Sequence, residues 1–238
     1  YLSIPLNIAP SLKNKPNVII YNGIDVVKFR EEKSSDKDFF IKTLPKKLDN
    51  DVWFVFAGTL GPSYDILNLL KVAGLLYEES NESIKIIIAG DGPLKREVNE
   101  FLVTYKGDIV TYVGQLNPEN LAELYQKCDV GLSTYTQYSN VEMCDKFYDY
   151  TAAGLSIINS LTGQVSKVIE ESDIGINYLA GDTAQLHEAM VSLSNDRIKN
   201  KEMARRSYDL GMTYDKNMQI EKLGPFIDDV MSSFNNNI

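Results

Sequence analysis

The chain has 238 residues, of which 44% are hydrophobic and 24% are charged. This composition is typical of a folded globular protein and excludes a disordered chain. A formal net charge of -9 and a pI near 4.8 argue against a groove for a nucleic-acid backbone and against electrostatic docking on anionic lipid. We therefore expect no nucleic-acid partner and, at most, peripheral association with a membrane.

Residues that commonly bind metals are scarce in this chain. His187 is the only histidine, and Cys128 and Cys144 are not in CxxC spacing. These counts exclude a multi-histidine metal centre or catalytic triad and suggest no disulfide framework, so we expect no metal and a cytoplasmic location. No apolar run reaches the roughly 18 residues of a membrane span, and no signal peptide is recognisable. The start at Tyr1 suggests that the sequence is a fragment.

The segment around residues 16–29, "PNVIIYNGIDVVKF", predicts a lone strand and a turn, and a charged linker follows it. We place the start of the main domain near residue 50. From there, short apolar β-branched runs alternate with helical segments, which predicts an α/β fold with a Rossmann-like, doubly wound parallel sheet of about six strands. The predicted strands are 52–58, 84–90, 109–114, 129–134, 155–160 and 174–179. The predicted helices lie near 64–79, 94–105, 117–127, 145–153, 163–171 and 183–194, and a helical tail follows.

Three predicted strands end in glycine, at "AGTLG", "AGDGP" and "VGQL". Ligands of open α/β sheets bind at the carboxyl edge of the strands. Gly58 and Gly61 would let the backbone approach a phosphate, and a helix beginning at about Pro62–Ser63 would direct free N–H groups to the same place. The alternative is that these glycines only form tight turns between strand and helix.

The segment "DKFYDYTAAG" at 145–154 places Lys146, Asp149 and Tyr150 on one face of a short helix. The helix N-terminus near Cys144 and Asp145 can donate hydrogen bonds to a diphosphate, and Lys146 adds a positive charge. Asp149 can accept hydrogen bonds from the two vicinal hydroxyls of a ribose. The alternative is a simple surface pair of Lys146 with Asp149.

Glu142 lies close enough to Asp149 in the sequence for the two carboxylates to act as an acid/base pair in one cleft. A solvated carboxylate in a loop is the competing interpretation. Tyr135, Tyr138 and Tyr148 are expected to pack or to line the rim of the site, with stacking on a base or sugar as the alternative.

Taken together, these segments resemble the C-terminal, nucleotide-sugar-binding half of the GT-B glycosyltransferases of retaining family four. The resemblance rests on "NGID" (22–25), "FAGTLG" (56–61), "AGDGP" (89–93), "YVGQL" (112–116) and "CDKFYDYTAAG" (144–154), which occur in the family's order. It covers nearly all of the chain.

The resemblance implies that residues 1–25 are a remnant of an N-terminal acceptor domain and hinge, that 26–50 are a linker, and that 51–238 form the donor domain with C-terminal crossing helices. It implies transfer of a hexose-type residue, without metal or cofactor, from a UDP- or GDP-linked donor. The acceptor would be a glycan or a lipid-linked molecule held by the missing domain. We expect bacterial surface polysaccharide synthesis in the cytoplasm, with the inner face of the membrane as an alternative site, and an isolated chain that does not transfer sugar.

The resemblance also implies which residues meet the donor, while catalytic residues stay unassigned. Asp149 stands at the family's ribose-binding glutamate, Lys146 stands beside the diphosphate, and residues 114–116 stand beside the base. The complete expected set is Gly58, Thr59, Gly61, Ser63, Gly92, Gly114, Gln115, Leu116, Glu142, Cys144, Asp145, Lys146, Asp149 and Tyr150.

Several positions depart from the family pattern. Asp149 replaces a glutamate, Cys144 replaces a proline, and Val141 stands where the first glutamate of the paired motif is expected, one position before Glu142. The arginine and lysine usual in the first loop and helix are absent before Lys71. These departures leave the identity of the sugar and the level of activity open.

Three alternative functions stay open. A NAD-dependent dehydrogenase would explain Asp91 after the second strand, although the first loop reads GTLG and not GxGxxG. A degenerate nucleotide-binding or scaffold domain would explain the departures at Val141 and Asp149. A sugar-nucleotide epimerase shares the two-domain architecture.

Overall fold

A six-stranded parallel sheet forms the centre of the protein, as shown by a computed structural model that describes residues 17–32, 43–105 and 108–235. The strand order is β3-β2-β1-β4-β5-β6, and all pairs are parallel. This is the doubly wound arrangement that the alternating pattern predicts, and all six predicted strands are confirmed. The strands are β1 (Val52–Ala57), β2 (Ile84–Ala89), β3 (Val110–Gly114), β4 (Val130–Ser133), β5 (Ser156–Asn159) and β6 (Gly175–Asn177).

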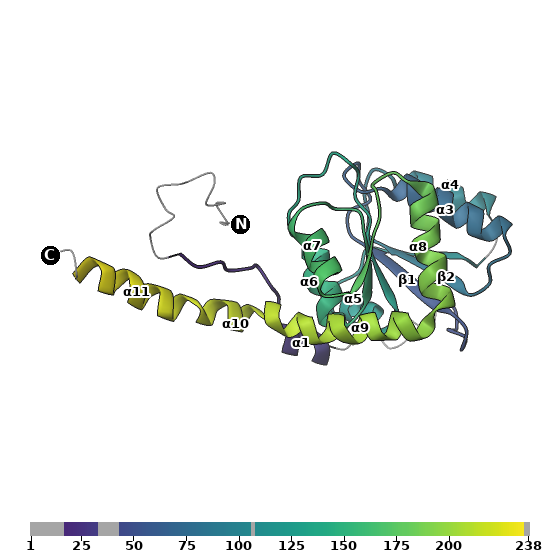
Figure 1. Cartoon of the computed structure of the whole chain (residues 1–238). Coiled ribbons are helices and arrows are strands. Elements are labelled where there is room, and N and C mark those ends of the chain that lie inside the picture. The colour runs from purple at the N-terminus through teal and green to yellow at the C-terminus, as the bar shows by residue number, and fades with distance from the viewer. Residues whose placement is uncertain (1–16, 33–42, 106–107, 236–238) are drawn as a thin grey trace.

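Helices cover both faces of this sheet (Figure 1). Side chains of α3 (Ile66–Glu78), α4 (Lys95–Thr104) and α8 (Thr183–Asn195) pack on one face. Those of α5 (Pro118–Lys127), α6 (Asp145–Ala153) and α7 (Gln164–Glu171) pack on the other. These helices confirm the predicted ones to within a few residues at each end.

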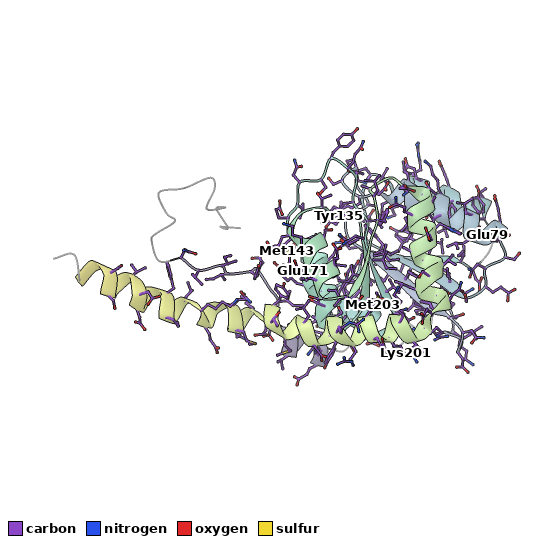
Figure 2. All side chains as sticks on the ribbon, in the orientation of Figure 1. Glu79, Tyr135, Met143, Glu171, Lys201 and Met203 are labelled. Carbon is purple, nitrogen blue, oxygen red and sulfur yellow. The ribbon has the colours of Figure 1, made fainter. Side chains whose placement is uncertain are left out.

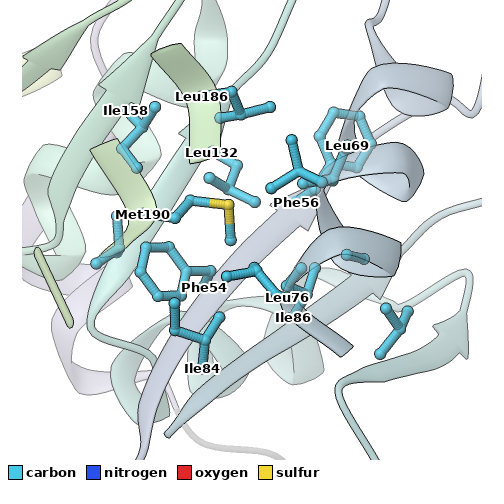
Figure 3. Close-up of a cluster of buried hydrophobic side chains, with 14 of the residues drawn as sticks. Phe54, Phe56, Leu69, Leu76, Ile84, Ile86, Leu132, Ile158, Leu186 and Met190 are labelled. Carbon is cyan, nitrogen blue, oxygen red and sulfur yellow. The ribbon is translucent and has the colours of Figure 1, made fainter. Parts of the chain in front are cut away.

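The central strand β1 is buried along its whole length because it contributes side chains to both cores. Phe54 and Phe56 point to the face covered by α3 and α8, where they meet Leu69 and Met190 (Figure 3). Trp53 and the other alternate side chains point to the opposite core. An apolar run without polar alternation is therefore what this position in the sheet requires.

One helix starts later than the sequence predicts. The helix expected from Pro62–Ser63 begins at Ile66, because the preceding residues pair with the segment that follows β4. Tyr64 and Tyr135 form an antiparallel bridge, and the Asp65 N–H donates to the carbonyl of Thr134 at 3.2 Å. The loops after β1 and β4 are therefore joined directly above the sheet.

The predicted lone strand near residues 18–21 is wrong, since no strand forms among residues 17–25 and only Ile24 makes an isolated bridge, to Asp215. The Val26 N–H donates to the Asp215 carboxylate at 3.0 Å, and the Lys216 N–H donates to the Ile24 carbonyl at 2.8 Å. Gly23 has a φ of +55° because its backbone lies against the Tyr214 carbonyl. The N-terminal segment is thus fastened to the C-terminal helices.

Helix α1 (Val26–Glu31) follows, within the segment expected to be a linker, and residues 33–42 of that segment lie outside the described part. The predicted helical tail is present as α9 (Arg197–Gly211), the short turn η2 (Met212–Tyr214), α10 (Lys216–Glu221) and α11 (Leu223–Asn235). Helix α9 packs across α6, and α10 and α11 extend away from the sheet (Figure 1).

Strand order reverses between β1 and β4, and this is where an open sheet leaves a crevice beyond its carboxyl ends. The loops at these ends are held by continued backbone pairing. The Gly58 N–H donates to Ala89 O at 3.0 Å, and the Gly90 N–H donates to Gly114 O at 2.7 Å. Gly90 has a φ of +134°, and a Cβ built on it would overlap the Gly58 carbonyl. Glycine is required here because two backbones touch.

We predict that Gly90→Ala destabilises the protein by about 2 kcal/mol or more, because it adds backbone strain and a steric clash that no flexible side chain can relieve. Urea unfolding of the wild type and variant measures the difference. Gly224→Ala is the matched control, since a Cβ at Gly224 meets open space and its φ is not positive, so we expect no loss there. Equal stability of Gly90→Ala and wild type would contradict the backbone packing described for these loops.

Candidate functional site

Two hollows lie beyond the carboxyl ends of the strands, and Thr59 borders both. The first, which we call the strand-end pocket, has a volume of about 300 Å³ and lies over the ends of β1 and β2. The second, the α6 pocket, has a volume of about 700 Å³ and lies against the start of α6. Both lie at the carboxyl edge of the sheet, where the sequence predicts ligand binding, and the α6 pocket lies at the reversal of strand order.

The strand-end pocket is formed by small residues and one loop. It is lined by Ala57, Gly58, Thr59, Ala89, Gly90, Asp91, Gln115, Leu116 and Leu121. Alanine and glycine at the strand ends have small side chains or none, so they leave space for a ligand. Leu116 and Leu121 form an apolar wall. A flat apolar group with polar edges fits such a lining, since Gln115 and backbone amides supply hydrogen bonds.

The α6 pocket contains four of the predicted residues besides Thr59. Gly61, Ser63, Cys144 and Asp145 line it. Tyr135 and Tyr138, which were expected to pack or to line the rim, also line this pocket. The sequence interpretation did not select Tyr64, which reaches the pocket through the pairing of distant loops, and it noted Asn22 only as part of the NGID motif. Figure 2 shows Tyr135, another lining residue, at the loop end of the sheet, well away from Lys201 on α9.

Three helices that start near the two pockets, α3, α4 and α6, have no side-chain cap, whereas Asn117 caps α5 beside the strand-end pocket. Five of the described helices begin with an aspartate or asparagine whose side chain accepts a hydrogen bond from the first turn. No such bond is made at the starts of α3, α4 and α6. At α6 the N-cap is Cys144, whose thiol is a weak acceptor. The free N–H groups and the helix dipole of α6 can therefore serve an anion.

Lys146 is buried, with 6% of its surface exposed, and no carboxylate of the described residues forms an ion pair with it. Its Nζ instead lies 4.1 Å from the centre of the Tyr64 ring. A Cβ built on Gly58 would lie 2.5 Å from this Nζ, so the glycine makes room for the ammonium at the border of the pockets. The positive charge is therefore held next to the loop that was predicted to meet a phosphate.

Asp149 lies one turn further along α6 and is half-buried. No hydrogen-bond donor contacts its carboxylate within the described part of the chain. Burial raises the pKa of Asp149 from 3.8 to about 7, while the charge of Lys146 opposes this rise and the charge of Asp145 adds to it. This carboxylate is therefore free to accept hydrogen bonds from a ligand that reaches it.

Two predicted residues are engaged elsewhere. The Glu142 carboxylate accepts from the Gln164 N–H at 2.9 Å, and its carbonyl accepts from the Val165 N–H at 3.0 Å, so it holds the start of α7. Glu142 is exposed in the loop before α6, as the solvated-carboxylate interpretation expects, and it is not paired with Asp149. The Tyr150 hydroxyl donates to carbonyls of β1 and β4, including that of Leu132 at 3.1 Å, and its ring is fully buried. Both residues shape the site without facing it.

Of the remaining predicted glycines, Gly92 follows β2 and Gly114 ends β3, and neither lines one of the two pockets. Gly92 packs against the Leu60 carbonyl, and Gly114 has a φ of +72° with open space beside it. Among the described residues no cluster of three or more histidine, cysteine or acidic side chains could hold a metal ion. None of the described helices combines the length and apolar character that crossing a membrane requires.

A family model described as "Glycosyl transferases group 1" matches residues 36–210, well over half of the chain. The chain is also 26% identical, over 179 residues, to the chitobiosyldiphosphodolichol beta-mannosyltransferase of Kluyveromyces lactis. That alignment covers 71% of this chain and 39% of the relative.

Solved structures share the fold. HepE of Anabaena in complex with UDP has a TM-score of 0.70 at 15% identity, covering 89% of this chain and 57% of that one. The C-terminal domain of the group 1 family glycosyl transferase LpcC from Francisella tularensis has a TM-score of 0.64 at 13% identity, covering 80% of this chain and 97% of that domain. The chain therefore spans well under two thirds of both the Kluyveromyces relative and HepE.

We predict that Asp149→Asn stabilises the protein at pH 8 and brings no such gain at pH 4. The raised pKa means that ionising Asp149 costs more in the folded than in the unfolded state, so wild-type stability falls as the pH rises from about 4 to about 7. One pKa unit corresponds to about 1.36 kcal/mol, and we expect a gain of about 1–3 kcal/mol at pH 8.

Urea unfolding of the wild type and variant at both pH values measures this gain. Asp228→Asn is the control, since Asp228 is exposed on α11 and its charge does not act on Asp149. A gain of equal size at pH 4 and pH 8 would show that burial of the charge is not its cause.

Proposed function

This chain belongs to the group 1 glycosyl transferases, and from this premise we propose that it is the donor-binding half of a GT-B enzyme that transfers a sugar from a nucleoside-diphosphate donor. The fold supports this role, since it matches a C-terminal domain of the same family over nearly that whole domain. The proposed donor carries uracil or guanine as its base. The complex of the structural relative HepE with UDP supports the first of these.

The observation that carries the proposal is the state of Lys146 and Asp149. Both are charged side chains on one face of α6, Lys146 is buried and Asp149 is half-buried, and neither makes an ion pair or a side-chain hydrogen bond in the described part. Burying a charge without a partner is costly, so such groups are retained where a ligand completes them. A nucleoside diphosphate supplies an anion for the lysine and two hydroxyls for the carboxylate.

The two pockets suggest how the donor lies. We place the base in the strand-end pocket, against Gln115 and Leu116, and the ribose beside Asp149. The diphosphate would lie over Gly58 and Thr59, where the N-terminus of α6 and Lys146 meet it. The sugar would then enter the α6 pocket, which Thr59 connects to the strand-end pocket.

The chemistry that these groups support is departure of the nucleoside diphosphate. As the bond between the anomeric carbon and the phosphate oxygen breaks, negative charge grows on the diphosphate. The Lys146 ammonium and the open N–H groups of α6 lie where they stabilise this charge more in the transition state than in the ground state. No metal is needed for this role, and we propose none.

The acceptor would meet the sugar across a cleft that a second domain completes. An apolar stripe on the extending tail supports such a neighbour, because Ile220, Leu223, Ile227 and Met231 are exposed at helical spacing. The name of the Kluyveromyces relative supports a lipid-linked acceptor, with a glycan as the alternative. We retain surface polysaccharide assembly at the inner face of a bacterial membrane as the process, and we expect the chain alone to bind donor without transferring sugar.

A second candidate is a nucleotide-binding domain without catalytic activity. Val141 is exposed and apolar where the family pattern has an acid, and Glu142 is occupied at the start of α7. A site with only one carboxylate facing the donor would favour binding over transfer.

We predict that the chain binds one of UDP, GDP and ADP with micromolar to millimolar affinity in calorimetric titrations, and binds NADH no better than that nucleotide. Asp149→Ala should weaken the preferred diphosphate at least tenfold, about 1.4 kcal/mol, because two hydrogen bonds from the ribose are lost. Glu142→Ala should weaken it less, since Glu142 does not face the site. Absence of binding by every nucleoside diphosphate would overturn the proposal, and preferential binding of NADH would favour a dehydrogenase.

A further inference from the structure

We propose that Phe56, Tyr64 and Tyr135 form an aromatic cage that positions the Lys146 ammonium without an ion pair and so keeps it available to the diphosphate. This inference rests on the proposed function and deepens it, since it assigns positioning roles to three residues that do not themselves need to touch the donor. The ligand that we propose for the Lys146 ammonium is a nucleoside diphosphate and not a neutral nucleoside.

The geometry of the cage is explicit. The Lys146 Nζ lies 4.1 Å from the ring centre of Tyr64, 5.0 Å from that of Phe56 and 5.7 Å from that of Tyr135. All three distances fall within the range of cation–π attraction, about 6 Å. The rings also hold one another, with Tyr64 edge-on to Phe56 at 5.4 Å and tilted against Tyr135 at 4.7 Å.

A second buried lysine in the same sheet shows what makes Lys146 different. Lys85 on β2 is as deeply buried, with 7% of its side chain exposed, and it forms an ion pair with Asp108 at 2.8 Å. That pair is neutral as a whole. Lys146 is stabilised by the quadrupoles of aromatic rings, which carry no net charge. These contacts do not neutralise the ammonium, so it can still attract an anion at the site.

The cage is fixed by the topology of the sheet. Phe56 belongs to β1, Tyr64 follows β1, and Tyr135 follows β4, so the rings come from both sides of the strand reversal. The antiparallel bridge between Tyr64 and Tyr135 locks them together, and the Tyr135 N–H is held by Ser160 Oγ. The ammonium is therefore placed before any ligand arrives, which lowers the entropic cost of binding an anion.

The cage gives Lys146 a larger share in binding the diphosphate, because the arginine and lysine that the family pattern places in the first loop and helix are absent before Lys71. Gly58 leaves the space beside the loop empty of side chain, and Lys146 fills that space from the opposite side of the reversal.

The test uses the intact chain and compares each nucleoside diphosphate with its own nucleoside, UDP with uridine and GDP with guanosine. Tyr64→Leu removes a ring of the cage, Tyr64→Phe keeps it, and Lys146→Met removes the charge. Tyr77→Leu on α3 is the matched control, because Tyr77 is an aromatic residue outside the site. Calorimetry gives the dissociation constants, and circular dichroism with thermal unfolding confirms that each variant is folded.

We expect Tyr64→Leu to weaken diphosphate binding about fivefold or more and to leave nucleoside binding unchanged, in proportion to the loss of one cation–π contact. Tyr64→Phe and Tyr77→Leu should stay within about twofold of wild type, and Lys146→Met should lose at least as much as Tyr64→Leu. If Tyr64→Leu weakens diphosphate and nucleoside equally, the ring only packs and the cage is refuted.

Two further outcomes separate the cage from the proposed function. If Lys146→Met weakens diphosphate binding and Tyr64→Leu does not, the donor site stands and the cage fails. The cage also fails if Tyr64→Phe loses as much as Tyr64→Leu, since the hydroxyl would then be the active group. If wild type binds neither diphosphate, or Lys146→Met binds as wild type does, the proposed donor site itself is wrong.

Discussion

A buried ammonium at the reversal of strand order is the constraint on which the rest of this structure depends. Lys146 loses most of its hydration, and aromatic rings from both sides of the reversal replace it. For these rings to converge, the loops after β1 and β4 must pair, and Gly58 must lack a side chain. The sheet order, the glycine loop and the start of α6 are therefore parts of one electrostatic arrangement.

The helix ends and acidic side chains also differ in whether they have a partner within the chain. Aspartate and asparagine side chains cap several helices, and Glu142 secures α7, while the N-terminus of α6 has no side-chain cap. Asp149 remains half-buried with a raised pKa and no donor. Stability is thus reduced at the positions where a ligand would restore it, which is the usual relation between a binding site and the fold that carries it.

The sheet could be predicted from sequence because continuous apolar runs such as 52–57 are compatible only with strands buried on both faces. The place of Lys146 on α6 could be predicted from helical spacing. The cage could not be predicted, because Tyr64 and Tyr135 come into contact only when β1 and β4 are neighbours in the sheet. The local spacing of residues does not determine this strand order. The apolar run near residues 18–21 has the composition of a strand, but the structure forms no strand among residues 17–25. The segment is held instead by the isolated bridge between Ile24 and Asp215.

The most direct test of this account is a crystal structure of the chain with the nucleoside diphosphate that binds it most tightly. The account predicts a phosphate oxygen within ion-pair distance of Lys146 Nζ, with the ammonium still between the rings of Tyr64 and Tyr135. It also predicts the ribose hydroxyls at the Asp149 carboxylate and the base against Leu116. A nucleotide bound away from the strand reversal, or one whose diphosphate points away from Lys146, would contradict it.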